Sequence, residues 1–166
     1  MLGVHRAFNP EAKSLGLPEL PRYVLRAHDK RLEQIIAAAQ RVNQLVVVEG
    51  DSSTGKTRAL WEAVIQLPDD WRLWQPADAH ALRDGLVARL VTAQTVVWLD
   101  DLQNYLDLRL TPLAEANASA LRELIAGPGQ SPILVAATTW PHIWQELNVQ
   151  RFDVGLVPLQ KPTWIL

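Results

Sequence analysis

The stretch VVVEGDSSTGKTRALWEAV, from Val46 to Val64, restricts the fold of this 166-residue chain more than any other part of it. The continuous apolar run over 45–49 is typical of a strand buried on both faces of a parallel sheet. Gly50 and Gly55 bracket a short polar loop, and a helical pattern follows over 56–66. The stretch therefore predicts a buried strand, a tight loop and a helix in direct succession.

The loop matches the pattern G-x-x-x-x-G-K-[ST] without a gap. Its glycines let backbone N–H groups approach an anion closely, and the helix that follows adds its own free N–H groups and the positive end of its dipole. Lys56 can reach the β- and γ-phosphates of a nucleotide, the Thr57 hydroxyl can ligate Mg²⁺, and Asp51 is expected to face solvent. We therefore predict a phosphate-binding loop, the alternative being a glycine-rich turn with an incidental lysine; its residues are Gly50, Asp51, Ser52, Ser53, Thr54, Gly55, Lys56 and Thr57.

Strand and helix patterns alternate along the rest of the chain. Apolar runs predict strands over 71–75, 95–99 and 133–137, and helical spacing predicts helices over 28–41, 78–94, 112–126 (capped by Thr111) and 141–147. A last strand is predicted over 152–159, although Gly155 and Pro158 disfavour it. This alternation indicates an α/β fold, a three-layer α/β/α sandwich with a mostly parallel sheet. We expect one domain over 22–166, preceded by an irregular lead-in over 1–21.

Polar side chains follow two of these strands. Asp100 and Asp101 come directly after 95–99, and Thr138 and Thr139 come directly after 133–137. Because ligands of open parallel sheets bind at the carboxyl ends of the strands, we expect these groups beside the loop. There Asp100 would hold the metal, Asp101 would orient or deprotonate water, and Thr138 would sense the γ-phosphate. The alternatives are that the acids favour a turn and that threonine merely suits a strand end.

Composition excludes some classes of function. A net charge of −2 and a pI near 6.1 do not indicate nucleic-acid binding. No stretch approaches the roughly 18 apolar residues of a membrane-spanning helix, so no membrane contact is expected. Cysteine is absent from the sequence, which fits a cytoplasmic location. A guanine-reading N-K-x-D run is also absent, so ATP is favoured over GTP as the nucleotide.

The loop GDSSTGKT, the strand end VVWLDD and the strand end ILVAATT occur in the order found in additional-strand P-loop NTPases. Upstream, 23–29 is similar to the box that precedes the loop in AAA+ and STAND ATPases, with Leu25 in place of the usual glycine and Asp29 in place of glutamate. The chain thus resembles the STAND-like ATPase modules of large actinobacterial regulatory proteins. The resemblance implies the strand order 5-1-4-3-2. Two departures are the sequence Thr138-Thr139-Trp140, where an arginine is usual after the threonines, and the 19 residues after Leu147, in which we expect no helical lid.

The resemblance implies a module that binds ATP with Mg²⁺, hydrolyses it slowly and acts as a regulatory switch. The alternatives are a nucleotide- or partner-binding module without turnover and a small-molecule kinase; a protein partner or self-association stays open. Besides the loop, Arg26 is expected to contact the base or a phosphate, the alternative being a surface residue at the start of a helix. The roles expected are catalysis by Lys56, Asp101 and Thr138 and metal binding by Thr57 and Asp100.

Overall fold

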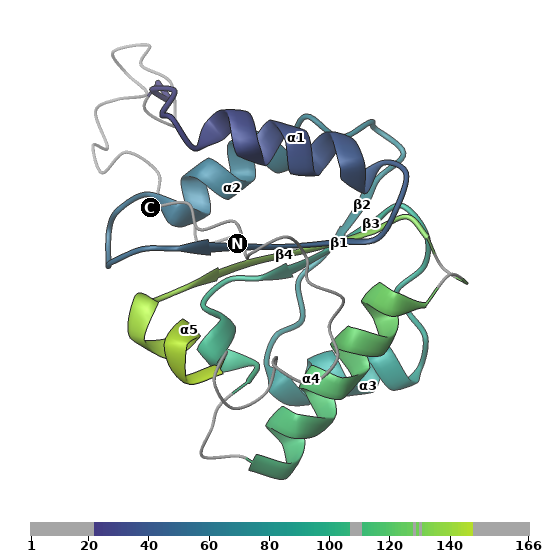
Figure 1. The fold of residues 1–166 in the computed structure, drawn as a ribbon. Coiled ribbons are helices and arrows are strands. Elements are labelled where there is room, and N and C mark those ends of the chain that lie inside the picture. The colour runs from purple at the N-terminus through teal and green to yellow at the C-terminus, as the bar shows by residue number, and fades with distance from the viewer. Residues whose placement is uncertain (1–21, 107–110, 128, 130, 148–166) are drawn as a thin grey trace, which may run out of the picture.

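The computed structural model describes residues 22–106, 111–127, 129 and 131–147, and the fold there is α/β. Four parallel strands form one sheet, with α1 and α2 on one face and α3, α4 and α5 on the other (Figure 1). The strands are β1 (Gln44–Glu49), β2 (Arg72–Trp74), β3 (Thr95–Leu99) and β4 (Ile133–Thr139). The helices are α1 (Asp29–Ala39), α2 (Lys56–Val64), α3 (Ala79–Val87), η1 (Leu102–Asn104, a 3₁₀ turn), α4 (Thr111–Ala126) and α5 (Pro141–Leu147).

The strands stand in the order β1-β4-β3-β2, so β4 lies between β1 and β3. The register pairs Val48 with Thr138 across β1 and β4, and Leu99 with Ala137 across β3 and β4. The residues that follow β1 and β3 therefore emerge on either side of the end of β4. The fifth strand expected over 152–159 lies outside the described residues.

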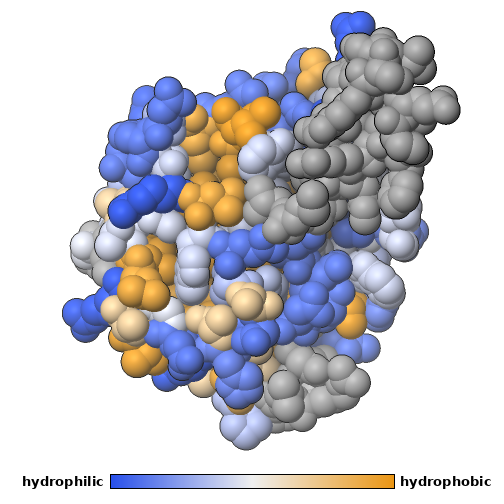
Figure 2. Space-filling view, turned by 180° about the vertical axis from the view of Figure 1, so that it is seen from behind, coloured by the Kyte–Doolittle hydropathy of each residue, from blue (hydrophilic) through white to orange (hydrophobic). Residues whose placement is uncertain are grey.

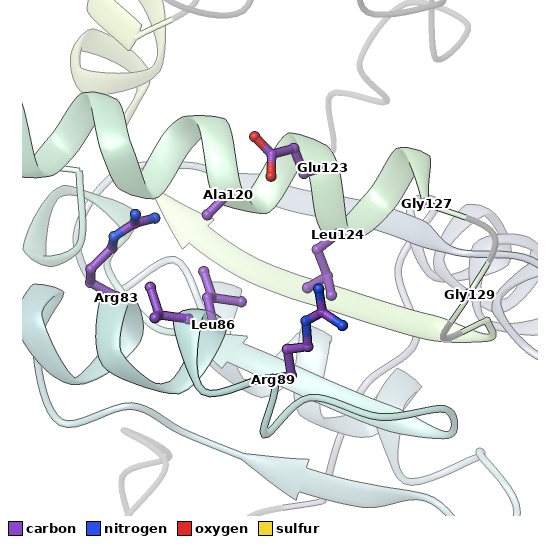
Figure 3. A pocket seen from close by; sticks show the side chains of 9 residues that line it. Arg83, Leu86, Arg89, Ala120, Glu123, Leu124, Gly127 and Gly129 are labelled. Atoms are coloured by element: carbon purple, nitrogen blue, oxygen red, sulfur yellow. The ribbon is translucent and has the colours of Figure 1, made fainter.

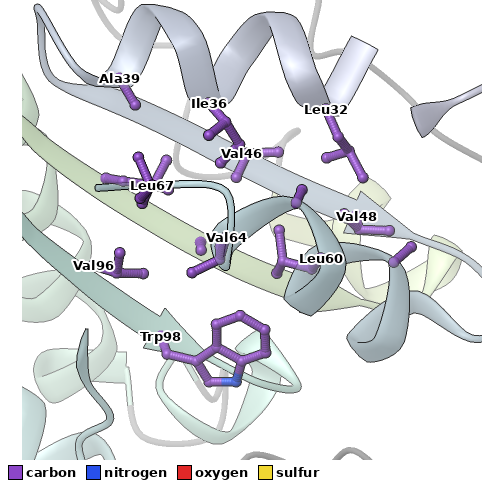
Figure 4. Close-up of a cluster of buried hydrophobic side chains, with 14 residues drawn as sticks. Leu32, Ile36, Ala39, Val46, Val48, Leu60, Val64, Leu67, Val96 and Trp98 are labelled. Atoms are coloured by element: carbon purple, nitrogen blue, oxygen red, sulfur yellow. The ribbon is translucent and has the colours of Figure 1, made fainter. Parts of the chain in front are cut away.

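Two apolar cores, one on each face of the sheet, hold the layers together. β3 and β4 are buried along their whole length, which explains their continuous apolar runs. Figure 4 shows the core under α1 and α2, which includes the fully buried Trp98. The rings of Trp98 and Trp61 form a T-shaped pair with centroids 6.3 Å apart. On the outer surface, apolar side chains gather in separate groups among polar ones (Figure 2). Within the described ranges, no helix combines the length and apolar character needed to cross a membrane.

The helix predicted over 78–94 is shorter than expected, because α3 ends at Val87. The Arg89 amide donates to the Leu86 carbonyl and the Leu90 amide to the Gly85 carbonyl, which is the hydrogen-bond pair of a Schellman helix end. Arg89 adopts the left-handed backbone that this ending requires, with φ of 53°. Leu90, which lies beyond this helix end, is 66% exposed. The other predicted elements within the described residues agree with the structure to within two residues.

The side chain of Asn43 fastens the end of α4 to the start of β4. Its Nδ2 lies 3.0–3.2 Å from the carbonyl oxygens of Leu124, Ile125 and Gly127, and its Oδ1 accepts from the Ile133 amide at 2.9 Å. The amide thus satisfies carbonyls that the helix end leaves free.

We expect Asn43→Ala to lower the free energy of unfolding by about 2 kcal/mol, because half-buried backbone groups lose their partners. Urea denaturation measures this change. The exposed Gln40→Ala, at the C-cap of α1, is the matched control and should change stability by less than about 0.5 kcal/mol. Equal effects of the two substitutions would contradict the role given to Asn43.

Candidate functional site

The carboxyl ends of β1, β3 and β4 open onto a cleft of about 680 Å³, here called the loop cleft. The segment before α1, the loop between β1 and α2, the residues after β3 and Trp140 after β4 all reach it. Eight of the residues assigned to the site from sequence line the cleft, namely Arg26, Ser52, Ser53, Gly55, Lys56, Thr57, Asp100 and Asp101. Gly50, Asp51, Thr54 and Thr138 do not line it and take the positions described below.

Residues 50–57, here called the glycine loop, need both glycines. A Cβ on the buried Gly50 would lie 2.8 Å from Oγ1 of Thr54, closer than such atoms approach. Gly55, the N-cap of α2, has φ of 87°, a left-handed conformation that glycine adopts without strain. Thr54 Oγ1 donates to the Asp51 carbonyl at 2.9 Å, which ties the loop to itself, and the Asp51 side chain is exposed as expected.

Free donors gather on the glycine loop. Among the described residues, no acceptor bonds to the backbone N–H groups of 51–57. Nζ of Lys56 donates to the carbonyl oxygens of Gly50 and Asp51, at 2.9 and 2.8 Å, and so lies against the same loop. A row of free N–H groups at the start of a helix, with an ammonium beside it, fits an anion with several oxygens.

The Asp100 carboxylate and the backbone amide of Asp101 belong to a hydrogen-bonded group with two hydroxyls. Oγ1 of Thr57 lies 2.9 Å from Oδ1 of Asp100. The Thr138 hydroxyl donates to the same Oδ1 at 2.7 Å and accepts from the Asp101 amide at 2.9 Å. The strand register explains this meeting, since Ala137 stands beside Leu99 and Thr138 is the next residue along β4.

Thr138 is fully buried, and its hydroxyl bonds to the Asp100 carboxylate and to the Asp101 backbone amide rather than facing the loop cleft. The next residue, Thr139, is equally buried, but its Oγ1 has no partner among the described residues. Asp101 has φ of 58°, in the left-handed region that costs a non-glycine residue about 1 kcal/mol or more. The bond from the Asp101 amide to Thr138 helps to hold it there.

Arg26 lies against the glycine loop, and its Nη1 donates to the Thr54 carbonyl at 2.8 Å. Asp29 positions this segment, since it accepts from the Tyr23 hydroxyl at 2.7 Å and from the Arg26 amide at 2.5 Å. Arg58 stacks over the Tyr23 ring at 5.7 Å. Burial, and then the hydrogen bond to Asp29, raises the pKa of Tyr23, so its phenol stays a donor.

Sequence reasoning gave no role to Tyr23 or Arg58, although both line the loop cleft. Tyr23 lies in the upstream box and Arg58 directly follows the loop, and these positions were the only signals for them. Tyr105 was also missed. Burial, and then the charges of Asp100 and other nearby acids, raises the pKa of Tyr105, which donates to the Pro76 carbonyl at 3.0 Å and fixes the turn after Asp101.

The donor set suits Mg²⁺ bound together with a phosphate group. Within the described ranges no group of three His, Asp or Glu side chains could hold a metal alone. Thr57 and Asp100 nevertheless offer two hard oxygen ligands 2.9 Å apart beside the free amides. Mg²⁺ takes few protein ligands when phosphate oxygens and water complete its octahedron, so the residues fit this ion.

The sequence matches no known protein-family model, and it has no significant match among curated proteins.

Proposed function

We propose that this chain is an ATP-binding P-loop module of the additional-strand division, similar to AAA+ and STAND ATPases, that hydrolyses ATP slowly with Mg²⁺. The contact between Thr57 and Asp100, 2.9 Å long and beside a loop of free amides, carries the proposal. The proposal implies the strand order 5-1-4-3-2, of which the described residues supply the part β1-β4-β3-β2. The module acts in the cytoplasm as a regulatory switch, through a protein partner or a second copy.

Each group at the loop cleft has a part in holding the nucleotide. The free amides of the glycine loop donate to the β- and γ-phosphate oxygens, and Lys56 turns from the loop carbonyls to the same oxygens. Arg26, bonded to the Thr54 carbonyl, adds positive charge on the outer side of the loop. It therefore contacts a phosphate rather than the base of the nucleotide. Thr57 and Asp100 hold Mg²⁺, which when bound neutralises charge on the phosphate oxygens.

Asp101 acts as the general base toward the attacking water. Its carboxylate accepts a proton as the water oxygen forms a bond to the γ-phosphorus, while the bond from that phosphorus to the β–γ bridging oxygen breaks. ADP and phosphate leave, and Asp101 returns the proton to solvent. Thr138 is a positioning residue for this step, because its hydroxyl bonds to both the Asp101 amide and the Asp100 carboxylate. This replaces the direct γ-phosphate contact expected for Thr138 from sequence.

The two neighbouring threonines provide a matched test of that positioning. We expect Thr138→Val to lower the rate of phosphate release about tenfold and to raise the Mg²⁺ concentration needed for half the maximal rate, because the Asp100 carboxylate and the Asp101 amide each lose a partner. Thr138→Ser should restore most of the rate, and Thr139→Val should leave both quantities unchanged. Steady-state assays over a Mg²⁺ series measure this, and similar effects of the two valine substitutions would reduce Thr138 to a packing residue.

One assay separates the proposed hydrolysis from its alternatives. The chain is incubated with Mg·ATP labelled at the γ-phosphate, with and without an added mixture of small alcohols and amines, and labelled products are separated. Label released as inorganic phosphate supports hydrolysis. Label on an added acceptor indicates a kinase. ATP that binds and is recovered intact indicates a binding module without turnover, and an absence of binding contradicts the proposal.

A further inference from the structure

A second cleft, of about 500 Å³, lies between α3 and α4, and we call it the helix cleft. Its residues come from the last turns of both helices and from the turns after them. These segments precede β3 and β4, so the helix cleft opens at the amino ends of the strands, away from the glycine loop at the carboxyl ends. The lining residues used below are Arg83, Leu86, Val87, Arg89, Glu123 and Leu124.

The helix cleft combines two guanidinium groups with an apolar floor. In Figure 3, Arg83 and Arg89 turn from the α3 side toward α4, with Leu86 between them and Leu124 opposite. Arg83 makes one long hydrogen bond, 3.4 Å to the Ala116 carbonyl, and no carboxylate pairs with either arginine among the described residues. Glu123, the acid of the cleft, accepts instead from the Ser119 hydroxyl at 3.3 Å.

The backbone at Arg89 is a second, independent feature. Arg89 occupies the left-handed position of the Schellman ending of α3, with φ of 53°, where glycine is the usual residue. A residue with a side chain is strained there, and strain that persists at a cleft is an indication of function. Arg89 thereby adds a second guanidinium group to the helix cleft.

The surface beside the helix cleft indicates the size of its ligand. Val87, on the rim, is 63% exposed, and the neighbouring Leu90 is 66% exposed. An enclosed small molecule would leave both in water, whereas an extended polypeptide segment would cover them as well as the floor. Extended chains advance about 3.3 Å per residue, so acids two to four residues apart span a distance similar to that between Arg83 in α3 and Arg89 just after it, six positions along the chain.

We propose that the helix cleft binds a short acidic segment of a partner protein. Two carboxylates of the segment pair with Arg83 and Arg89, and an apolar side chain between them packs on Leu86 and Leu124. The interaction does not depend on the nucleotide proposed for the loop cleft. The cleft thus provides a site for the partner of the module at the opposite end of the sheet.

The test uses fluorescence anisotropy of five-residue peptides that carry a neutral dye, two glutamates spaced two, three or four residues apart, and leucine between them. At least one peptide is expected to bind the full chain saturably and to weaken as salt is added. Peptides with lysine in place of glutamate should not bind. The double variant Arg83→Gln/Arg89→Gln should weaken binding about tenfold or more. Lys30→Gln/Arg31→Gln, at two exposed cations on α1 across the sheet, makes the same charge change and should have no effect.

Arg89→Gly separates binding from folding. Glycine suits the left-handed backbone, so this variant should melt at the same or a higher temperature while it binds the acidic peptide more weakly. The proposal is overturned if no glutamate peptide binds better than its lysine counterpart, or if the Arg83→Gln/Arg89→Gln and Lys30→Gln/Arg31→Gln variants bind alike. Displacement of the peptide by decanoate at equal concentration would assign the cleft to a small anionic amphiphile instead and would also overturn the proposal.

Discussion

Asp101→Asn is expected to slow phosphate release from Mg·ATP by about 100-fold or more while ATP affinity changes by less than about twofold, since a positioned base contributes on this scale. Asparagine has nearly the same shape and tolerates the left-handed backbone that Asp101 adopts, with φ of 58°. The amide of the residue can still donate to Thr138. The substitution therefore removes the proton acceptor and leaves the geometry of the turn.

The measurement pairs a phosphate-release assay with equilibrium binding of a fluorescent ATP analogue. Asp69→Asn is the control, because Asp69 is exposed and makes no described side-chain contact. If Asp101→Asn releases phosphate at the parent rate while Asp100→Asn does not, Asp101 is not the general base. If both acids are dispensable, hydrolysis does not occur at this edge of the sheet.

Lys56→Ala is expected to weaken the binding of Mg·ATP by about 100-fold or more, because charge-assisted bonds to the β- and γ-phosphates are lost. The partners of Lys56 in the structure are two carbonyl oxygens of the glycine loop, and the bond to the Asp51 carbonyl is exposed to solvent. The melting temperature should consequently change little. Loss of binding together with an unchanged melting temperature would identify Lys56 as a ligand-binding group rather than a structural one.

Lys30→Ala is the matched control for this substitution. Lys30 is exposed on α1 and makes no described contact, so its loss should leave ATP affinity unchanged. A comparable loss of affinity in both lysine variants would show a general effect of net charge. Lys56→Arg adds a further comparison, because the wider guanidinium does not replace a compact ammonium in a tight loop and should restore little affinity.

Elements whose signal is local were predictable from the sequence. The strand over 95–99 and the helix over 141–147 have the predicted bounds, because a continuous apolar run and a proline at the first helical turn each specify their own element. The end of α3 was predicted seven residues too late. The sequence there carries Arg89 where a helix end in the left-handed conformation usually has glycine, so the usual stop signal was missing.

Contacts made across the sheet were harder to predict. The sequence placed Asp100, Asp101 and Thr138 at one edge, and the structure brings them together. It could not show that the Thr138 hydroxyl bonds to the Asp100 carboxylate and the Asp101 amide, because that depends on the register of β3 against β4. The stack of Tyr23 under Arg58 likewise joins segments whose meeting depends on how the chain before α1 packs on α2.

Calorimetric titration of ATP into the full chain, with and without Mg²⁺ and alongside Lys56→Ala, tests most directly whether the glycine loop holds a triphosphate. The account predicts one site per chain in the parent, affinity that falls about tenfold or more when Mg²⁺ is chelated, and little or no binding in the variant. Binding of equal strength in the parent and in Lys56→Ala, or no binding to the parent at millimolar ATP, would contradict it.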